Sequence, residues 1–184
     1  MSLPAATTRS AARAETRLKL RLLIPVLLLA GASIANAQGE GDVLDSKDVP
    51  ETVRQQVDCG TEADDVTRRA FAGGFVFAWR CPGNHANEMK ALVFAASADG
   101  SGARLIRFPT PNPKKTETEI SNVRWLPKSG EIAQLFVDPE SRICRIESRW
   151  RVEGARAVLT HWRQTRDCKG RGGWLTLVNR APQR

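Results

Sequence analysis

The chain has 184 residues and a formal net charge of +8, with four cysteines and only two histidines. No C-x₂-C spacing occurs, which argues against a zinc site, and we expect no metal and no cofactor. The charge is uneven, because residues 38–140 hold 12 basic and 16 acidic side chains, whereas residues 141–184 hold 11 basic and 3 acidic ones. This polarity can steer an anionic partner toward one face but says nothing about the fold.

The first 37 residues predict a secretory signal peptide. Five basic residues precede an apolar core, Leu22 to Ala30, and Ala35-Asn36-Ala37 matches a small-x-small cleavage site. The core is too short to cross a hydrocarbon layer of about 30 Å as a helix, whereas a signal peptide needs only this length. An uncleaved membrane anchor is the alternative. We expect cleavage near Ala37 to release a periplasmic or secreted chain with no membrane span.

The mature chain is expected to begin with a leader and a short helix. Residues 38–49 are polar, acidic and poor in apolar side chains, which predicts a flexible leader. A single β-rich domain should then occupy residues 50–184. Its first element is the helix "PETVRQQV", since Asp48 offers an N-cap and Pro50 stands in the first turn.

Beyond Cys59 the pattern predicts short strands. Runs rich in β-branched and aromatic residues alternate with turn sequences such as "PGNHANE" and "ADGSG". We expect strands at 74–81, 89–97, 103–109, 120–126, 131–137, 144–152, 156–165 and 173–179. About eight strands with almost no helix predict an all-β fold, either an antiparallel sandwich or a barrel-like sheet.

The four cysteines predict two disulfides, because an even number in an exported chain is typical of a disulfide framework. Three pairings are possible. The cysteines fall into an early and a late pair, 22 and 24 residues apart, which favours Cys59–Cys81 with Cys144–Cys168. Each bridge would contribute roughly 3 kcal/mol in the chain-entropy model.

The sequence "SRWRVEGARAVLTHWRQ" predicts a hairpin with one charged face. In its first strand the arginines alternate with Ser148, Trp150 and Val152, which we expect to be buried. A two-residue turn would bury His161 and place Trp162 beside the arginines. A three-residue bulged loop would reverse the second strand and turn Trp162 inward.

From about residue 71 to 184 the chain resembles the bacterial family called domain of unknown function 1176. The matching pieces are "FVFAWRCPG", "ARLIRFPTPNP", "SNVRWLPKSGEIAQLF" and the segment from "RICRIESRW" to "GGWLTLVNR". The family usually has Gly-Asp-Cys-Gly where this chain has Arg142-Ile143-Cys144-Arg145. The resemblance implies a secreted, disulfide-bearing, β-rich envelope protein and brings no activity with it.

The residue patterns of common enzymes are weak in this chain. No G-x-S-x-G elbow is present, and only His85 and His161 could serve as a base. We expect His161 to be a hydrogen-bonded core residue, His85 to be solvated, and all four cysteines to be used in disulfides. No catalytic residue is therefore assigned, although a hydrolase or enzyme inhibitor with a composite site stays open as an alternative.

The basic C-terminal quarter gives the candidate binding site. We expect an anion-binding face made of Arg145, Arg149, Arg151, Trp162 and Arg163. An exported protein seldom meets nucleic acid, so an anionic envelope polymer, a lipid head group or an acidic protein is the expected partner. The alternative is that the arginines only solvate the outer face of the hairpin while the tryptophans fill the core.

Overall fold

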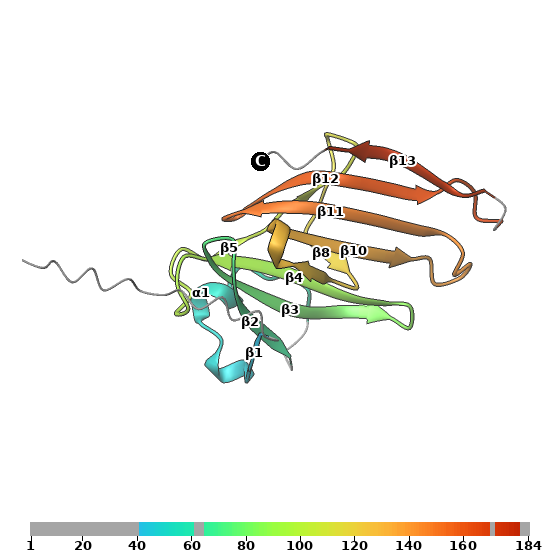
Figure 1. The fold of residues 1–184 in the computed structure, drawn as a ribbon. Helices are drawn as coiled ribbons and strands as arrows, with labels where there is room; N and C mark the ends of the chain where they lie inside the picture. The colour runs from blue at the N-terminus through green and yellow to red at the C-terminus, as the bar shows by residue number, and fades with distance from the viewer. Residues whose placement is uncertain (1–40, 61–64, 170–171, 181–184) are drawn as a thin grey trace, which may run out of the picture. The chain divides into compact units, whose positions relative to one another are not determined.

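The computed structural model describes residues 41–60, 65–169 and 172–180, which belong to one compact unit. The expected signal peptide, its cleavage site and the first residues of the leader lie outside the described residues. The regular structure of the described chain is almost entirely antiparallel strand, and most of the strands form two facing sheets (Figure 1). The predicted all-β antiparallel class is confirmed, in the form of a sandwich.

The first sheet, called sheet A, has six strands in the order β1-β2-β3-β4-β5, and β8 also pairs with β4. These strands are β1 (Asp42–Leu44), β2 (Val66–Phe71), β3 (Gly74–Asn84), β4 (Asn87–Ala95), β5 (Arg104–Leu105) and β8 (Glu119–Ser121). Long β3 and β4 form a hairpin at its centre, and short strands flank them.

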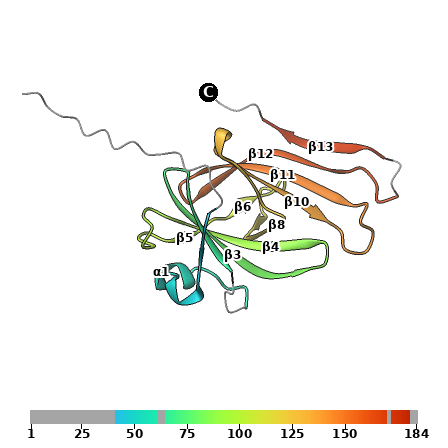
Figure 2. The same ribbon diagram turned by 60° about the horizontal axis from the view of Figure 1, so that its bottom comes forward.

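The second sheet, called sheet B, has five strands in the order β13-β12-β11-β10-β9. These are β9 (Arg124–Leu126), β10 (Glu131–Val137), β11 (Arg145–Glu153), β12 (Arg156–Thr165) and β13 (Trp174–Asn179). Two further short strands, β6 (Phe108–Pro109) and β7 (Thr116–Glu117), pair with each other. Figure 2 shows β6 in the space between the two sheets.

Most strand predictions match the structure closely. The expected strands at 131–137 and 156–165 have the observed bounds, whereas 103–109 and 120–126 each divide into two short strands. Three strands, β1, β2 and β7, were not predicted. In β2 the adjacent residues Arg68 and Arg69 interrupt the alternation of polar and apolar side chains. Each has a partner in the fold: Arg68 forms an ion pair with Asp42, and the Arg69 guanidinium lies 4.9 Å from the centre of the Trp125 ring.

The leader prediction is wrong for residues 42–49. Val43 of β1 pairs with Thr67 of β2, and a 3₁₀ helix follows at Ser46–Asp48. Val49 is fully buried, so this acidic stretch is part of the folded domain. The predicted helix exists as the single turn α1 (Glu51–Arg54), but Pro50 rather than Asp48 occupies its N-cap position.

Two apolar clusters hold the domain together. The larger lies between the sheets and includes Leu92 and Ile106 beside Ile132, Trp150 and Trp162 of sheet B. The smaller lies on the other side of sheet A. Its fully or nearly fully buried members come from the α1 segment and sheet A: Val49, Val53, Val66, Phe77, Trp79, Cys81, Ala91, Val93 and Ala95. Sheet A is therefore covered on both faces, which explains the nearly continuous apolar run of β3.

Side-chain amides join the two sheets where their backbones diverge. Asn87 at the start of β4 donates to the Val137 carbonyl oxygen of β10 (2.6 Å) and accepts from the Val137 amide (2.8 Å). Asn122, in the left-handed region at φ 47°, donates to the Leu135 carbonyl oxygen (2.8 Å). These two asparagines replace the backbone ladder that a closed barrel would need here.

Both expected disulfides are present, Cys59–Cys81 and Cys144–Cys168. The first ties the chain after α1 to β3 and belongs to the smaller cluster. The second joins the loop before β11 to the loop after β12. Two disulfides are typical of a protein from an oxidising extracytoplasmic compartment.

Candidate functional site

The first strand of the predicted hairpin has the expected two faces. Ser148, Trp150 and Val152 of β11 are buried, while Arg149 and Arg151 lie on the solvent side of sheet B. Trp150 packs edge-on against Phe108, and its ring nitrogen donates to the Pro109 carbonyl oxygen (2.8 Å). The two-residue turn at Gly154-Ala155 sets Trp150 opposite Leu159.

The prediction that Trp162 lies beside the arginines is wrong. Arg149 pairs with His161 while Trp150 pairs with Leu159, so Thr160 is an extra residue in β12. This bulge reverses the alternation, and Trp162, only 6% exposed, packs edge-on against Trp150. The Thr160 hydroxyl donates to the Glu131 carboxylate (2.7 Å) at the bulge.

The same bulge overturns the expectation for His161. It lies opposite Arg149 on the outer face and is only partly buried. Its Nε2 has no hydrogen-bond partner among the described residues, so it is not bonded to the neighbouring Thr160–Glu131 pair. His85 is exposed, as expected, and its Nε2 lies 3.3 Å from the Pro139 carbonyl oxygen.

A carboxylate organises the arginines at the centre of the outer face. Arg149 donates to one oxygen of Glu147 (3.2 Å), and Arg163 donates to the other through Nε (2.9 Å) and through a terminal nitrogen. Burial opposes ionisation of Glu147, but these hydrogen bonds outweigh it and hold the pKa of the carboxyl below its ordinary value. Glu147 thereby fixes two guanidinium groups and neutralises one of their charges.

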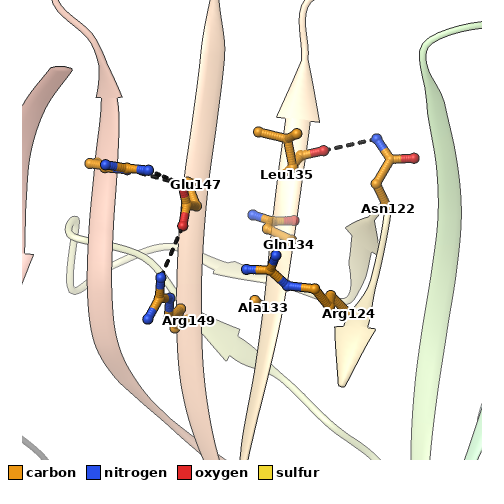
Figure 3. Close-up of a pocket in the computed structure, with 8 residues that line it drawn as sticks. Asn122, Arg124, Ala133, Gln134, Leu135, Glu147 and Arg149 are labelled. Atoms are coloured by element: carbon orange, nitrogen blue, oxygen red, sulfur yellow. Dashed lines mark hydrogen bonds and ion pairs between the residues drawn. The ribbon is translucent and has the colours of Figure 1, made fainter. Parts of the chain in front are cut away.

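Arg124 enters the same site from β9. It pairs with Ala133 of β10, which in turn pairs with Arg149, so the three residues form a row across the sheet. Figure 3 shows the Arg124 side chain crossing above β10 with its guanidinium directed toward β11. Because Ala133 is small, the row encloses a shallow cavity of about 490 Å³ that Arg163 also lines.

We call the outward arginines of β9, β11 and β12 the arginine face: Arg124, Arg145, Arg149, Arg151 and Arg163. Arg151 continues the outer side next to Glu131, and Arg145 lies at the far end of β11, where its Nε is 3.4 Å from the Arg142 carbonyl oxygen. Among the described residues, Arg124 and Arg151 form no ion pair. The face thus carries five cations and retains unneutralised charge.

Trp174 supplies the aromatic group that was predicted at Trp162. The Arg163 guanidinium lies 4.4 Å from the centre of the Trp174 ring, a cation–π contact worth about 0.5–1 kcal/mol at an exposed site. Of the five predicted site residues, the structure places the four arginines on one face and removes Trp162. The structure adds Arg124 and Glu147, whose outward direction alternation within β9 and β11 could have indicated. It also adds Trp174, which could be placed beside Arg163 only once the register between β12 and β13 was known.

The described residues contain no group of three or more His, Cys, Asp or Glu side chains placed to hold a metal ion. None of their helices has the length and apolar character needed to cross a membrane. Comparisons of the chain with protein-family models, curated proteins and solved structures found no match. The resemblance to the domain of unknown function 1176 family therefore stays a prediction.

Proposed function

We propose that this protein is an exported, non-catalytic envelope protein that binds an anionic envelope component through the arginine face. Its ligand presents several phosphate or carboxylate groups, as an envelope polymer or a layer of lipid head groups does. The observation that carries the proposal is the convergence of Arg124, Arg149 and Arg163 around one shallow cavity.

The chemistry of guanidinium supports this ligand class. Arginine presents planar, paired N–H donors that match the oxygens of phosphate and carboxylate. Glu147 already holds Arg149 and Arg163 in place, so binding costs less side-chain entropy than it would with free arginines. Arg124 and Arg151 provide charge that no described acid neutralises.

The test compares two double variants of equal charge. Arg124→Gln with Arg149→Gln removes two cations from the face, and Arg104→Gln with Lys114→Gln removes two exposed cations elsewhere. Binding to polyphosphate and to phosphatidylglycerol vesicles is measured at low and high salt, with phosphatidylcholine vesicles as the neutral control. The two anionic probes separate a polymer from a head-group ligand.

We expect the first double variant to bind at least about tenfold more weakly and the second to bind like the unmodified protein. Affinity should fall as salt rises, since the Debye length shortens from about 10 Å at 0.1 M to about 3 Å at 1 M. Equal weakening by both double variants, or affinity that does not change with salt, would refute the proposal.

A further inference from the structure

One sheet edge differs from all the others in the described chain. The other edge strands of sheets A and B, namely β1, β5, β8 and β9, have two or three residues each, whereas β13 has six. Short edge strands limit pairing with other chains, because they offer few free backbone groups. Figure 1 shows β13 at the margin of sheet B, where β12 is its one neighbour among the described strands.

The hydrogen bonds to β12 show which backbone groups of β13 have no partner in the part of the chain that the structure describes. The Arg166 amide donates to the Gly173 carbonyl oxygen (2.9 Å), so the amide and carbonyl of Gly173 point toward β12. Backbone direction alternates along a strand, and the groups of Trp174 and Thr176 therefore point to the open edge. A register shift near Leu177 interrupts the ladder after this point.

The side chains of β13 are unusually apolar for an open edge. Trp174, Leu175 and Leu177 are 36%, 37% and 48% exposed, and they make up half of the large hydrophobic residues that are exposed in the described chain. Natural edge strands usually carry charges or proline that prevent pairing. An apolar, unprotected edge of this length is typical of a strand that a partner covers.

The charge around β13 indicates the chemistry of that partner. Its described neighbourhood contains six cations: Arg142, Arg145, Arg163, Arg166, Lys169 and Arg180. The two nearby acids are already engaged, because Glu147 binds two arginines and Asp167 accepts from the backbone amides of Lys169 and Gly172. A second copy would bring two cationic edges together, whereas an acidic strand would complement them.

We propose that β13 binds an extended, acidic segment of a partner protein by strand addition. The partner's backbone pairs with the free groups of Trp174 and Thr176, its apolar side chains cover the exposed side chains of β13, and its carboxylates face the surrounding cations. This inference goes beyond the ligand of the arginine face, because it uses the backbone edge of sheet B.

The test uses a fluorescent peptide of alternating valine and glutamate, with a peptide of alternating valine and lysine as its charge control. Thr176→Pro removes a backbone N–H that faces the open edge and leaves the bonds to β12 in place. Thr176→Val is the matched control, since it changes the same side chain but keeps the N–H. Thermal unfolding establishes that each variant is folded.

We expect the acidic peptide to bind, the lysine peptide not to bind, and Thr176→Pro to weaken binding at least about tenfold while Thr176→Val does not. Bound peptide should also slow hydrogen exchange at the Trp174 and Thr176 amides of the unmodified protein, a measurement that needs no variant. Arg124→Gln with Arg149→Gln should bind the peptide normally, which separates this inference from the arginine face.

Three results would overturn the inference. The first is equal binding of the acidic and lysine peptides, or of neither. The second is unchanged exchange at Trp174 and Thr176 in the presence of bound peptide. The third is a dimer of the unmodified protein that Thr176→Pro dissociates, which would identify a second copy as the occupant of β13.

Discussion

Sheets A and B use their outer faces in opposite ways. The outer face of sheet A is covered by the α1 segment, which buries Val53 against Phe77 and fixes the chain with the Cys59–Cys81 bridge. The outer face of sheet B is open to solvent and carries the arginine face. Sheet A is thus buried on both sides and serves as the support, while sheet B is left with one side on which a ligand can bind.

The largest expected effect comes from the core that the two sheets share. Trp150→Ala should lower the free energy of unfolding by about 3–5 kcal/mol, because it opens a large cavity and removes the bond to the Pro109 carbonyl oxygen. Leu135→Ala, on the outer side of sheet B, should cost less than about 1 kcal/mol. Chemical denaturation measures both, and similar losses would show that the outer side is not a free surface.

The two disulfides test whether the sheets are stabilised alike. Their sequence separations are nearly equal, 22 and 24, so the chain-entropy model gives each bridge about 3 kcal/mol. Cys59→Ser with Cys81→Ser should therefore cost about as much as Cys144→Ser with Cys168→Ser in urea denaturation. A difference above about 1.5 kcal/mol would mean that contacts in the folded state, rather than loop closure, set the contribution of one bridge.

The asparagines that join the sheets should matter less than the core. Asn87→Ala leaves the Val137 amide and carbonyl without their side-chain partner, and we expect a loss of about 1–3 kcal/mol. Asn179→Ala, an exposed change on β13, is the control and should have almost no effect. If the two variants have equal stability, the Asn87 bonds add nothing measurable to the apolar core that sheets A and B share.

The smallest effects are two pH dependences of opposite sign. The lowered pKa of Glu147 adds stability above the unfolded value of about 4.3, and this stability is lost as the pH falls through the folded pKa. Burial of Glu117 outweighs its hydrogen bond from Gln134 and raises its pKa, so ionisation of Glu117 costs stability above the folded pKa.

Glu147→Gln should accordingly lower the melting temperature at neutral pH, and Glu117→Gln should raise it. The Glu117→Gln difference should shrink as the pH falls through the raised pKa of Glu117 and be lost by the ordinary value of about 4.3. The Glu147→Gln difference should shrink only below about 4.3, as the pH falls through the lowered pKa of Glu147. Thermal unfolding across this range checks the prediction, and shifts of the same sign in the two variants would contradict it.

Alternation of polar and apolar residues within each segment was enough to predict most strands. The composition of the site could not be predicted as well, because it depends on how distant strands pair. The phase of Trp150 follows from β11 alone, and the cysteine spacing indicated both bridges. Trp162 could not be placed, since its direction depends on an extra residue in the middle of β12 and not on the turn. Arg124 was missed because alternation within β9 can indicate that its side chain faces outward but cannot show that β9 pairs with β10 and so lies in the same row as Arg149.

The extra residue at Thr160 also makes β12 tolerant of a change in length. If the chain lost Thr160 itself, the strand could pair regularly with β11 by giving up the bulge. Trp162 would still point into the core, and Arg163 would still reach Glu147. Deletion of the bulge residue would therefore shorten this hairpin by one residue without exchanging its apolar and cationic sides.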